Sequence, residues 1–151
     1  MVKIKRSMAI LLAAVLTCIC LVSCGSGDFE GKWECEEMSV GGMTIKDNFM
    51  GIPIAVSMQI ELKSDGKGTH YKTQNGTVAQ NDISWEKDGS KCKVTVDGKA
   101  LEFELKSGKL VAEYSESGQT AKVVLKKVDK FTEFTEEDAK KVANDLVNGN
   151  K

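Results

Sequence analysis

Pairs of turn-forming residues recur about every ten positions in the second half of the chain. In each pair a glycine follows an aspartate, asparagine or serine: Asp65-Gly66, Asn75-Gly76, Asp88-Gly89, Asp97-Gly98, Ser107-Gly108 and Ser117-Gly118. Such dipeptides favour two-residue hairpin turns, and the segments between them alternate apolar and polar residues, as strands with one buried face do. The spacing and the alternation together predict an antiparallel meander of short strands from Ile54 to Val128.

The predicted turns can be tested against one another, because each turn fixes which residues are opposed across its hairpin. The turns at Asp88-Gly89, Asp97-Gly98, Ser107-Gly108 and Ser117-Gly118 oppose mainly apolar residues on one face: Trp85 and Cys92, Cys92 and Phe103, Val94 and Leu101, Leu105 and Leu110, Phe103 and Ala112, Leu101 and Tyr114, Leu110 and Leu125, Ala112 and Val123, Tyr114 and Ala121. The other face carries opposed charges, such as Lys93 and Glu102. A slip of one residue would invert the faces of a strand, so this agreement supports the register.

The pattern fails at one hairpin. A two-residue turn at Asn75-Gly76 places Gln80 and Asp82 on the apolar face and Ile83 outside, so we expect a bulge or a longer loop between Thr77 and Asp82. The preceding hairpin, centred on Asp65-Gly66, places Tyr71 inside the sheet. It places His70, the single histidine of the chain, outside and opposite Glu61.

A further strand over Lys32 to Glu37 brings the number to about eight. Eight short antiparallel strands leave no free edge when they close into a barrel, so the fold class is mainly all-β, an up-and-down meander barrel. An open sandwich of two sheets is the alternative. A C-terminal helix is expected over about 135–148, with Thr135 as its N-cap and Gly149 at its end. Its apolar stripe is expected to pack outside the barrel on Val111 and Val124, through Val142 or Leu146.

The segment from Ser39 to Pro53 is too irregular for a strand and too apolar for an ordinary solvent-exposed loop. Its apolar residues are Met43, Ile45, Phe49, Met50 and Ile52.

The N-terminus has the features of an export signal. Lys3, Lys5 and Arg6 precede an uncharged apolar run, from Met8 to Val22, that is shorter than the roughly 18 to 20 residues of a membrane span. The run ends in Leu21-Val22-Ser23-Cys24, which resembles the lipobox of bacterial lipoproteins. This resemblance implies cleavage of a signal peptide (residues 1–23) and lipidation of Cys24, with palmitate or a similar acyl chain as the anchor.

The expected mature protein is therefore extracytoplasmic and anchored to a bacterial membrane in the cell envelope. It has a short tether over residues 24–28 and one domain over residues 29–151. The chain has 21 basic and 22 acidic residues, and the signal removes three of the basic ones, which leaves a net charge of about −4. This acidic balance, with no arginine after Arg6, argues against nucleic-acid binding.

The first strand opens with Gly31-Lys32-Trp33, followed by the long apolar segment, the meander and the helix. This arrangement resembles the lipocalins and the lipocalin-like domains of bacterial lipoproteins. The resemblance implies that Trp33 plugs the closed end of the barrel and that the segment from Met43 to Ile52 forms a lid over the open end. Lipocalins stack an arginine on this tryptophan, so Lys126 or Lys127 would replace it here.

No group of residues suggests catalysis, so we expect no enzyme, no cofactor and no metal. The first functional hypothesis is binding or transport of a small apolar ligand inside the barrel. Its candidate residues are the lid, Met43, Ile45, Phe49, Met50 and Ile52, and the interior, Trp33, Val56, Met58, Ile60, Tyr71, Trp85, Leu101, Phe103 and Tyr114. The alternative is that these interior residues have only a structural role and fill the barrel as a packed core.

The second hypothesis is a dry barrel that serves as a scaffold or inhibitor and binds an envelope protein through its surface or loops. The oligomeric state stays open at this point. Two cysteines remain in the mature domain after lipidation, and an exported protein often pairs such residues. Because Cys35 and Cys92 fall on the first and fifth strands of the ring, we expect free buried thiols instead.

Overall fold

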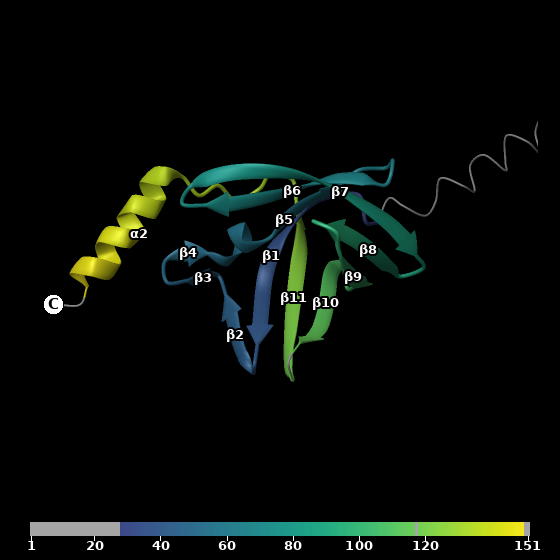
Figure 1. Cartoon of the computed structure of the whole chain (residues 1–151), viewed down its shortest axis with the longest axis horizontal. Coiled ribbons are helices and arrows are strands. Elements are labelled where there is room, and N and C mark those ends of the chain that lie inside the picture. The colour runs from purple at the N-terminus through teal and green to yellow at the C-terminus, as the bar shows by residue number, and fades with distance from the viewer. Residues whose placement is uncertain (1–27, 117, 150–151) are drawn as a thin grey trace, which may run out of the picture.

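Eight antiparallel strands close into a barrel in the computed structural model, which describes residues 28–116 and 118–149 (Figure 1). The ring runs through β1 (Gly31–Val40), β5 (Gln59–Leu62), β6 (Lys67–Gln74), β7 (Thr77–Asp88), β8 (Lys91–Val96), β9 (Lys99–Lys106), β10 (Lys109–Glu116) and β11 (Gln119–Val128). It closes because β11 pairs with β1 from Lys32–Val128 to Val40–Ala121. The predicted barrel is confirmed, and the sandwich alternative is wrong.

The predicted apolar segment between the first two barrel strands contains short elements of its own. These are β2 (Met43–Lys46), β3 (Asn48–Phe49), β4 (Ile52–Pro53) and a 3₁₀ helix, η1 (Ile54–Ser57). β2 pairs with the far half of β1, and β3 pairs with β4 in a small hairpin. The strand expected from Ile54 therefore begins only at Gln59, because the chain turns through η1 immediately after Pro53.

The registers of the last three hairpins agree with the sequence prediction at every pair that the ladders contain. Cys92 opposes Phe103, Leu105 opposes Leu110, and Leu110 opposes Leu125. The β7–β8 hairpin differs, because its turn lies one residue later, over Gly89 and Ser90, and Trp85 opposes Val94 rather than Cys92. The pairing shifts by two residues, so the predicted faces of both strands are kept.

The β5–β6 hairpin corrects the prediction for His70 and Tyr71. The Lys63 N–H donates the closing hydrogen bond to the Lys67 carbonyl at 2.8 Å, so the loop has three residues and ends at Gly66, which has φ +76°. This extra residue reverses the faces of β6: His70 opposes the buried Ile60 inside the barrel, and Tyr71 lies outside. The two-residue turn at Asn75-Gly76 then continues without the expected bulge, and Ile83 is buried.

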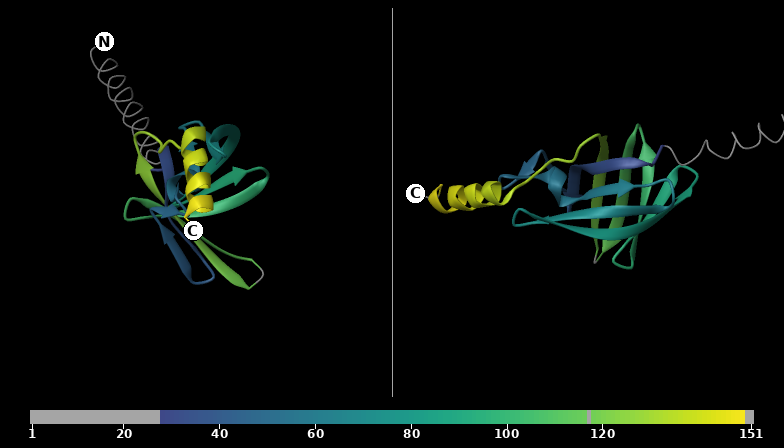
Figure 2. Two further views of the ribbon diagram at one scale, coloured as in Figure 1. Left: turned by 90° about the vertical axis from the view of Figure 1, so that its left-hand side faces the viewer. Right: turned by 90° about the horizontal axis from the view of Figure 1, so that it is seen from above.

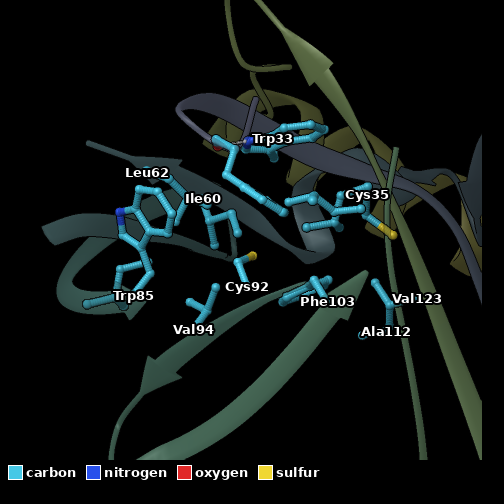
Figure 3. Packing of buried hydrophobic residues seen from close by; sticks show 14 of the residues in the cluster. Trp33, Cys35, Ile60, Leu62, Trp85, Cys92, Val94, Phe103, Ala112 and Val123 are labelled. Carbon is cyan, nitrogen blue, oxygen red and sulfur yellow. Dashed lines mark hydrogen bonds between the residues drawn. The ribbon is translucent and has the colours of Figure 1, made fainter. Parts of the chain in front are cut away.

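The core fills the middle of the barrel (Figure 3). Its largest fully buried side chains are Phe29, Trp33, Cys35, Ile60, Leu62, Cys92, Val94, Phe103, Leu110 and Leu125. The Trp33 indole donates a buried hydrogen bond of 2.7 Å to the carbonyl of Phe29, and the Lys127 Nζ lies 5.4 Å from the ring centroid of Trp33. Aromatic residues thus close the end of the barrel where β1 begins, and Lys127 lies over Trp33, as expected from the sequence.

The C-terminal helix, α2 (Glu136–Asn148), lies outside the ring and projects away from it (Figure 2). Thr135 caps it in a reciprocal capping box with Asp138. The predicted docking on Val111 and Val124 is wrong. Val142 lies against Gly51 at the tip of the β3–β4 hairpin instead, and Leu146 is 46% exposed.

The connection before α2 explains where the helix begins. Thr132 is bound by two side chains of the barrel wall: the buried Glu34 carboxylate accepts its N–H at 2.8 Å, and the Gln59 amide donates to its carbonyl at 2.8 Å. Phe131 packs against Tyr71 with ring centroids 4.9 Å apart and the ring planes tilted by 52°. These contacts fix the start of the helix beside the β6–β7 turn, where Gly76 lies against Glu136, and away from β10 and β11.

Candidate functional site

The interior candidates of the ligand hypothesis form part of the packed core. Trp33, Ile60 and Phe103 are at most 1% exposed, and Trp85 is 7% exposed. The Trp85 indole also donates hydrogen bonds to the carbonyls of Lys63 and Lys67, at 2.9 and 3.1 Å. These side chains are in contact with one another, as a filled eight-stranded barrel requires, and so they contribute to stability rather than to an open pocket.

Four other interior candidates lie outside the fully buried part of the core. Tyr71 lies on the outer face, where its hydroxyl donates to the Glu61 carboxylate at 3.2 Å, so the prediction that it lines the interior is wrong. Val56 belongs to η1 and is buried, whereas Met58 and Leu101 are half-buried and pack against the core. The structure therefore brings most of the predicted interior residues together within or against one packed core and places Tyr71 outside it.

The predicted lid residues lie largely on the surface. Met43, Phe49, Met50 and Ile52 are 64%, 50%, 57% and 41% exposed, while Ile45 packs against the core. Met50 and Gly51 form the tip of the β3–β4 hairpin, both with positive φ (54° and 84°). A methionine rarely adopts this conformation, and here it holds an apolar side chain out into solvent.

A second exposed apolar surface crosses the open end of the barrel. Successive ladders place four residues in one row over β2, β1, β11 and β10: Met43, Val40, Ala121 and Tyr114. We call this row the distal rim. Val40 is 43% and Tyr114 45% exposed, whereas Ala121 between them is buried. The next row towards the core, which contains Val123 and Ala112, is also buried. The distal rim lies at the end of β1 opposite Trp33 (Figure 1).

The barrel wall opens between β9 and β10. Their ladder holds only three pairs and ends at Glu104 and Val111, although the predicted register continues to Leu101 and Tyr114. A groove of about 250 Å³ lies at this opening, which we call the β9–β10 slot. Its lining residues are Lys91, Ala100, Leu101, Glu102, Glu104, Lys106, Val111, Ala112, Glu113 and Tyr114. The remaining predicted pairs of this hairpin, Phe103–Ala112 and Leu101–Tyr114, are absent.

The titratable groups of the interior are isolated. Burial raises the pKa of the Cys92 thiol to about 12 and also raises the pKa of Cys35, and both thiols are free and buried. Burial lowers the pKa of His70, whose Nδ1 has no hydrogen-bond partner. Across residues 28–116 and 118–149, no three His, Cys, Asp or Glu side chains gather as metal ligands.

Most of the predicted export features precede the first described residue, Asp28. The signal peptide (residues 1–23), the lipobox, Cys24 and the tether as far as Gly27 lie outside the described residues. Within the described part of the chain, no helix combines the length and the apolar character that crossing a membrane requires.

Sequence reasoning missed the β9–β10 slot, although the sequence contains a signal for it. The predicted register opposes Glu102 to Glu113, and like charges opposed across a strand pair destabilise the pairing.

Compared with known proteins, the chain matches no family model, and no curated protein is significantly similar to it.

Proposed function

We propose that this protein is a non-enzymatic, lipid-anchored protein of the bacterial cell envelope that binds a protein partner through apolar surfaces held away from the membrane. The filled barrel is the scaffold in this proposal. The observation that carries it is the separation of the candidate residues into two sets. One set is buried in the core, and the other, with Met43, Phe49 and Met50, is exposed outside it.

The orientation follows from the chain path if Cys24 carries the lipid. Five residues, 24–28, span at most about 17 Å when fully extended. The aromatic end of the barrel, at Phe29, would then stay close to the bilayer. β1 leads away from this end over 10 residues, about 30 Å at 3.3 Å per residue, and reaches the distal rim. The exposed apolar residues would therefore face away from the membrane that anchors the protein.

A protein partner suits these surfaces better than a small ligand does. Val142 of α2 lies against Gly51 at the tip of the β3–β4 hairpin, but the side chains of Phe49 and Met50 beside it are exposed. They offer protruding anchors for a partner rather than the walls of a concave pocket. Aromatic residues and methionine are enriched in protein interfaces. A small apolar molecule remains the second candidate, because the distal rim is an apolar row beside the mouth of the barrel.

Site-specific photo-crosslinking in the native host tests this proposal. A benzophenone amino acid at Phe49 or Met43 should give one protein adduct of defined mass, whereas the same probe at the exposed wall position Lys93 should give none. Adducts with lipid or another small molecule only, or equal protein adducts from Lys93, would contradict the proposal. The Cys24→Ala variant should leave the membrane fraction and lose palmitate labelling, which tests the anchor separately.

A further inference from the structure

We propose that the β9–β10 slot binds an extended peptide segment by strand addition, and that this segment alternates apolar and basic residues. The inference rests on the proposed function only in taking the partner to be a polypeptide. It has its own basis in the main chain of β9 and β10.

The free edges of the slot follow from the hydrogen-bond alternation of an antiparallel sheet. The Leu105 N–H donates to the Ser90 carbonyl at 2.8 Å, on the side of β8. Neighbouring residues of a strand point their N–H and C=O groups to opposite sides, so those of Ala100 and Glu102 point towards β10. By the same alternation from the Glu104–Val111 pair, the groups of Glu113 and Ser115 point towards β9. The ladder contains no partners for these four residues.

An extended peptide fits such edges for a geometric reason. The free groups recur at every second residue, about 6.8 Å apart along each strand, which is the repeat of the free edge of another strand. Other proteins recognise extended peptides by adding a strand to an open sheet edge in this way. A small apolar molecule would leave these main-chain groups without partners.

The side chains around the slot select the residues of the peptide. Leu101 and Tyr114 lie on the inner face of the barrel, where apolar side chains of an added strand would be placed. Glu102 and Glu113 are exposed on the outer face, where Glu102 forms an ion pair with Lys91 at 2.6 Å. Basic residues at alternate positions of the peptide would therefore lie next to these two carboxylates and relieve their mutual repulsion.

The opening has a cause in the sequence. β10 pairs with β11 over its whole length, to Glu116 and Gln119, and β9 pairs with β8 from Lys99 to Glu104. Each strand therefore follows its other neighbour, and the pairing between β9 and β10 stops where Glu102 would oppose Glu113. A basic peptide strand between them would replace this repulsion with attraction.

Amide hydrogen exchange measured by NMR tests the inference on the mature chain from residue 24, with Cys24→Ala. The barrel, its core and α2 all lie within residues 28–149 of this chain. In the free protein, the amides of Ala100, Glu102, Glu113 and Ser115 should exchange faster than those of Leu101, Phe103, Ala112 and Tyr114. An acetylated heptapeptide of alternating lysine and valine should slow the first group at least tenfold on one or both strands. The same peptide N-methylated at every residue keeps its side chains, loses the main-chain donors of both edges, and should slow none of these four amides.

The charge requirement has a matched control. Glu113→Lys should weaken binding of the lysine–valine peptide at least threefold, whereas Glu86→Lys, on the outer face of β7, should leave it unchanged. The inference is overturned if the four slot amides are already as protected as their neighbours, if the peptide slows none of them, or if the N-methylated peptide acts equally well. Because synthetic peptides are the probe, these outcomes are independent of crosslinking from Phe49, whose failure would count against the proposed function alone.

Discussion

Replacing Trp33 tests the closed end of the barrel. The side chain is 1% exposed, and a tryptophan buries roughly 150 to 250 Å². At about 25 cal/mol per Å², this burial contributes roughly 4 to 6 kcal/mol. Alanine keeps a small part of that area, so we expect Trp33→Ala to lower the free energy of unfolding by about 3 to 5 kcal/mol. For a domain with a total stability of about 5 to 15 kcal/mol, this loss ranges from about a fifth of the stability to all of it.

A second variant separates packing from hydrogen bonding. Trp33→Phe keeps an aromatic ring but removes the indole N–H, which leaves the buried carbonyl of Phe29 without its 2.7 Å partner. An unsatisfied buried acceptor costs about 1 to 3 kcal/mol, so this variant should lie between the wild type and Trp33→Ala. Val78→Ala serves as the control, because Val78 is 49% exposed and its replacement should change the stability by less than about 0.5 kcal/mol.

Urea denaturation followed by fluorescence measures all three variants. The chain has only two tryptophans, so Trp85 alone reports unfolding when Trp33 is replaced. The slope of the transition should stay constant while its midpoint falls, which identifies a change in native stability. An unchanged midpoint for Trp33→Ala would show that Trp33 does not plug the barrel. Equal midpoints for the alanine and phenylalanine variants would show that the hydrogen bond, and not packing, dominates.

Three further predictions concern other parts of the fold. Burial lowers the pKa of His70 in the folded state, so the unfolded chain takes up a proton at a higher pH than the folded protein does. The contribution of the neutral His70 to stability should therefore be complete above about pH 6.5. It should be lost as the pH falls from there through the lower pKa of the folded state. Urea midpoints of His70→Asn between pH 5 and 7 should show a smaller fall, and an identical fall would contradict this. Cys35 and Cys92 should not react with a thiol reagent at pH 8 until the protein unfolds, because burial raises both pKa values; rapid labelling of the native protein would show that the core is open. Thr135→Ala should remove the cap of α2 and cost about 0.5 to 2 kcal/mol of helix stability, measured as faster amide exchange in α2 with the barrel amides unchanged.

The sequence predicted the ring of strands well because the turn glycines and the two-residue alternation act together. From Lys91 to Val128 the pairs that form are the predicted ones, including Val94 with Leu101 and Tyr114 with Ala121. A hairpin loop that is longer by one residue is harder to foresee, since Asp65-Gly66 fits both a two-residue and a three-residue loop. That single residue exchanged the faces of His70 and Tyr71 and made a bulge in β7 appear necessary.

The position of α2 could not be predicted from its own apolar stripe. Val111 and Val124 form an apolar pair on the outer wall, and the stripe of the helix is long enough to cover them. The helix direction is set instead by polar contacts of Thr132 with Glu34 and Gln59, which are 98 and 73 residues away in the chain. Contacts between single polar residues at such separations have no periodic signature in the sequence.

The unequal lengths of the strands explain where the distal rim forms. β1 and β11 have 10 residues each and β10 has eight, whereas β8 has only six and β5 four. A closed ring with such strands is filled where all eight overlap, which is where the fully buried side chains lie. Beyond this region β2, β1, β11 and β10 continue as an open sheet whose inner face bears the distal rim. The distal rim arises from this mismatch in length. The β9–β10 slot does not, because β9 and β10 have eight residues each, and it opens where Glu102 would oppose Glu113. Tyr114 lines the slot and also belongs to the distal rim. A partner that pairs with the slot would therefore meet Tyr114 and the distal rim next along the same strand.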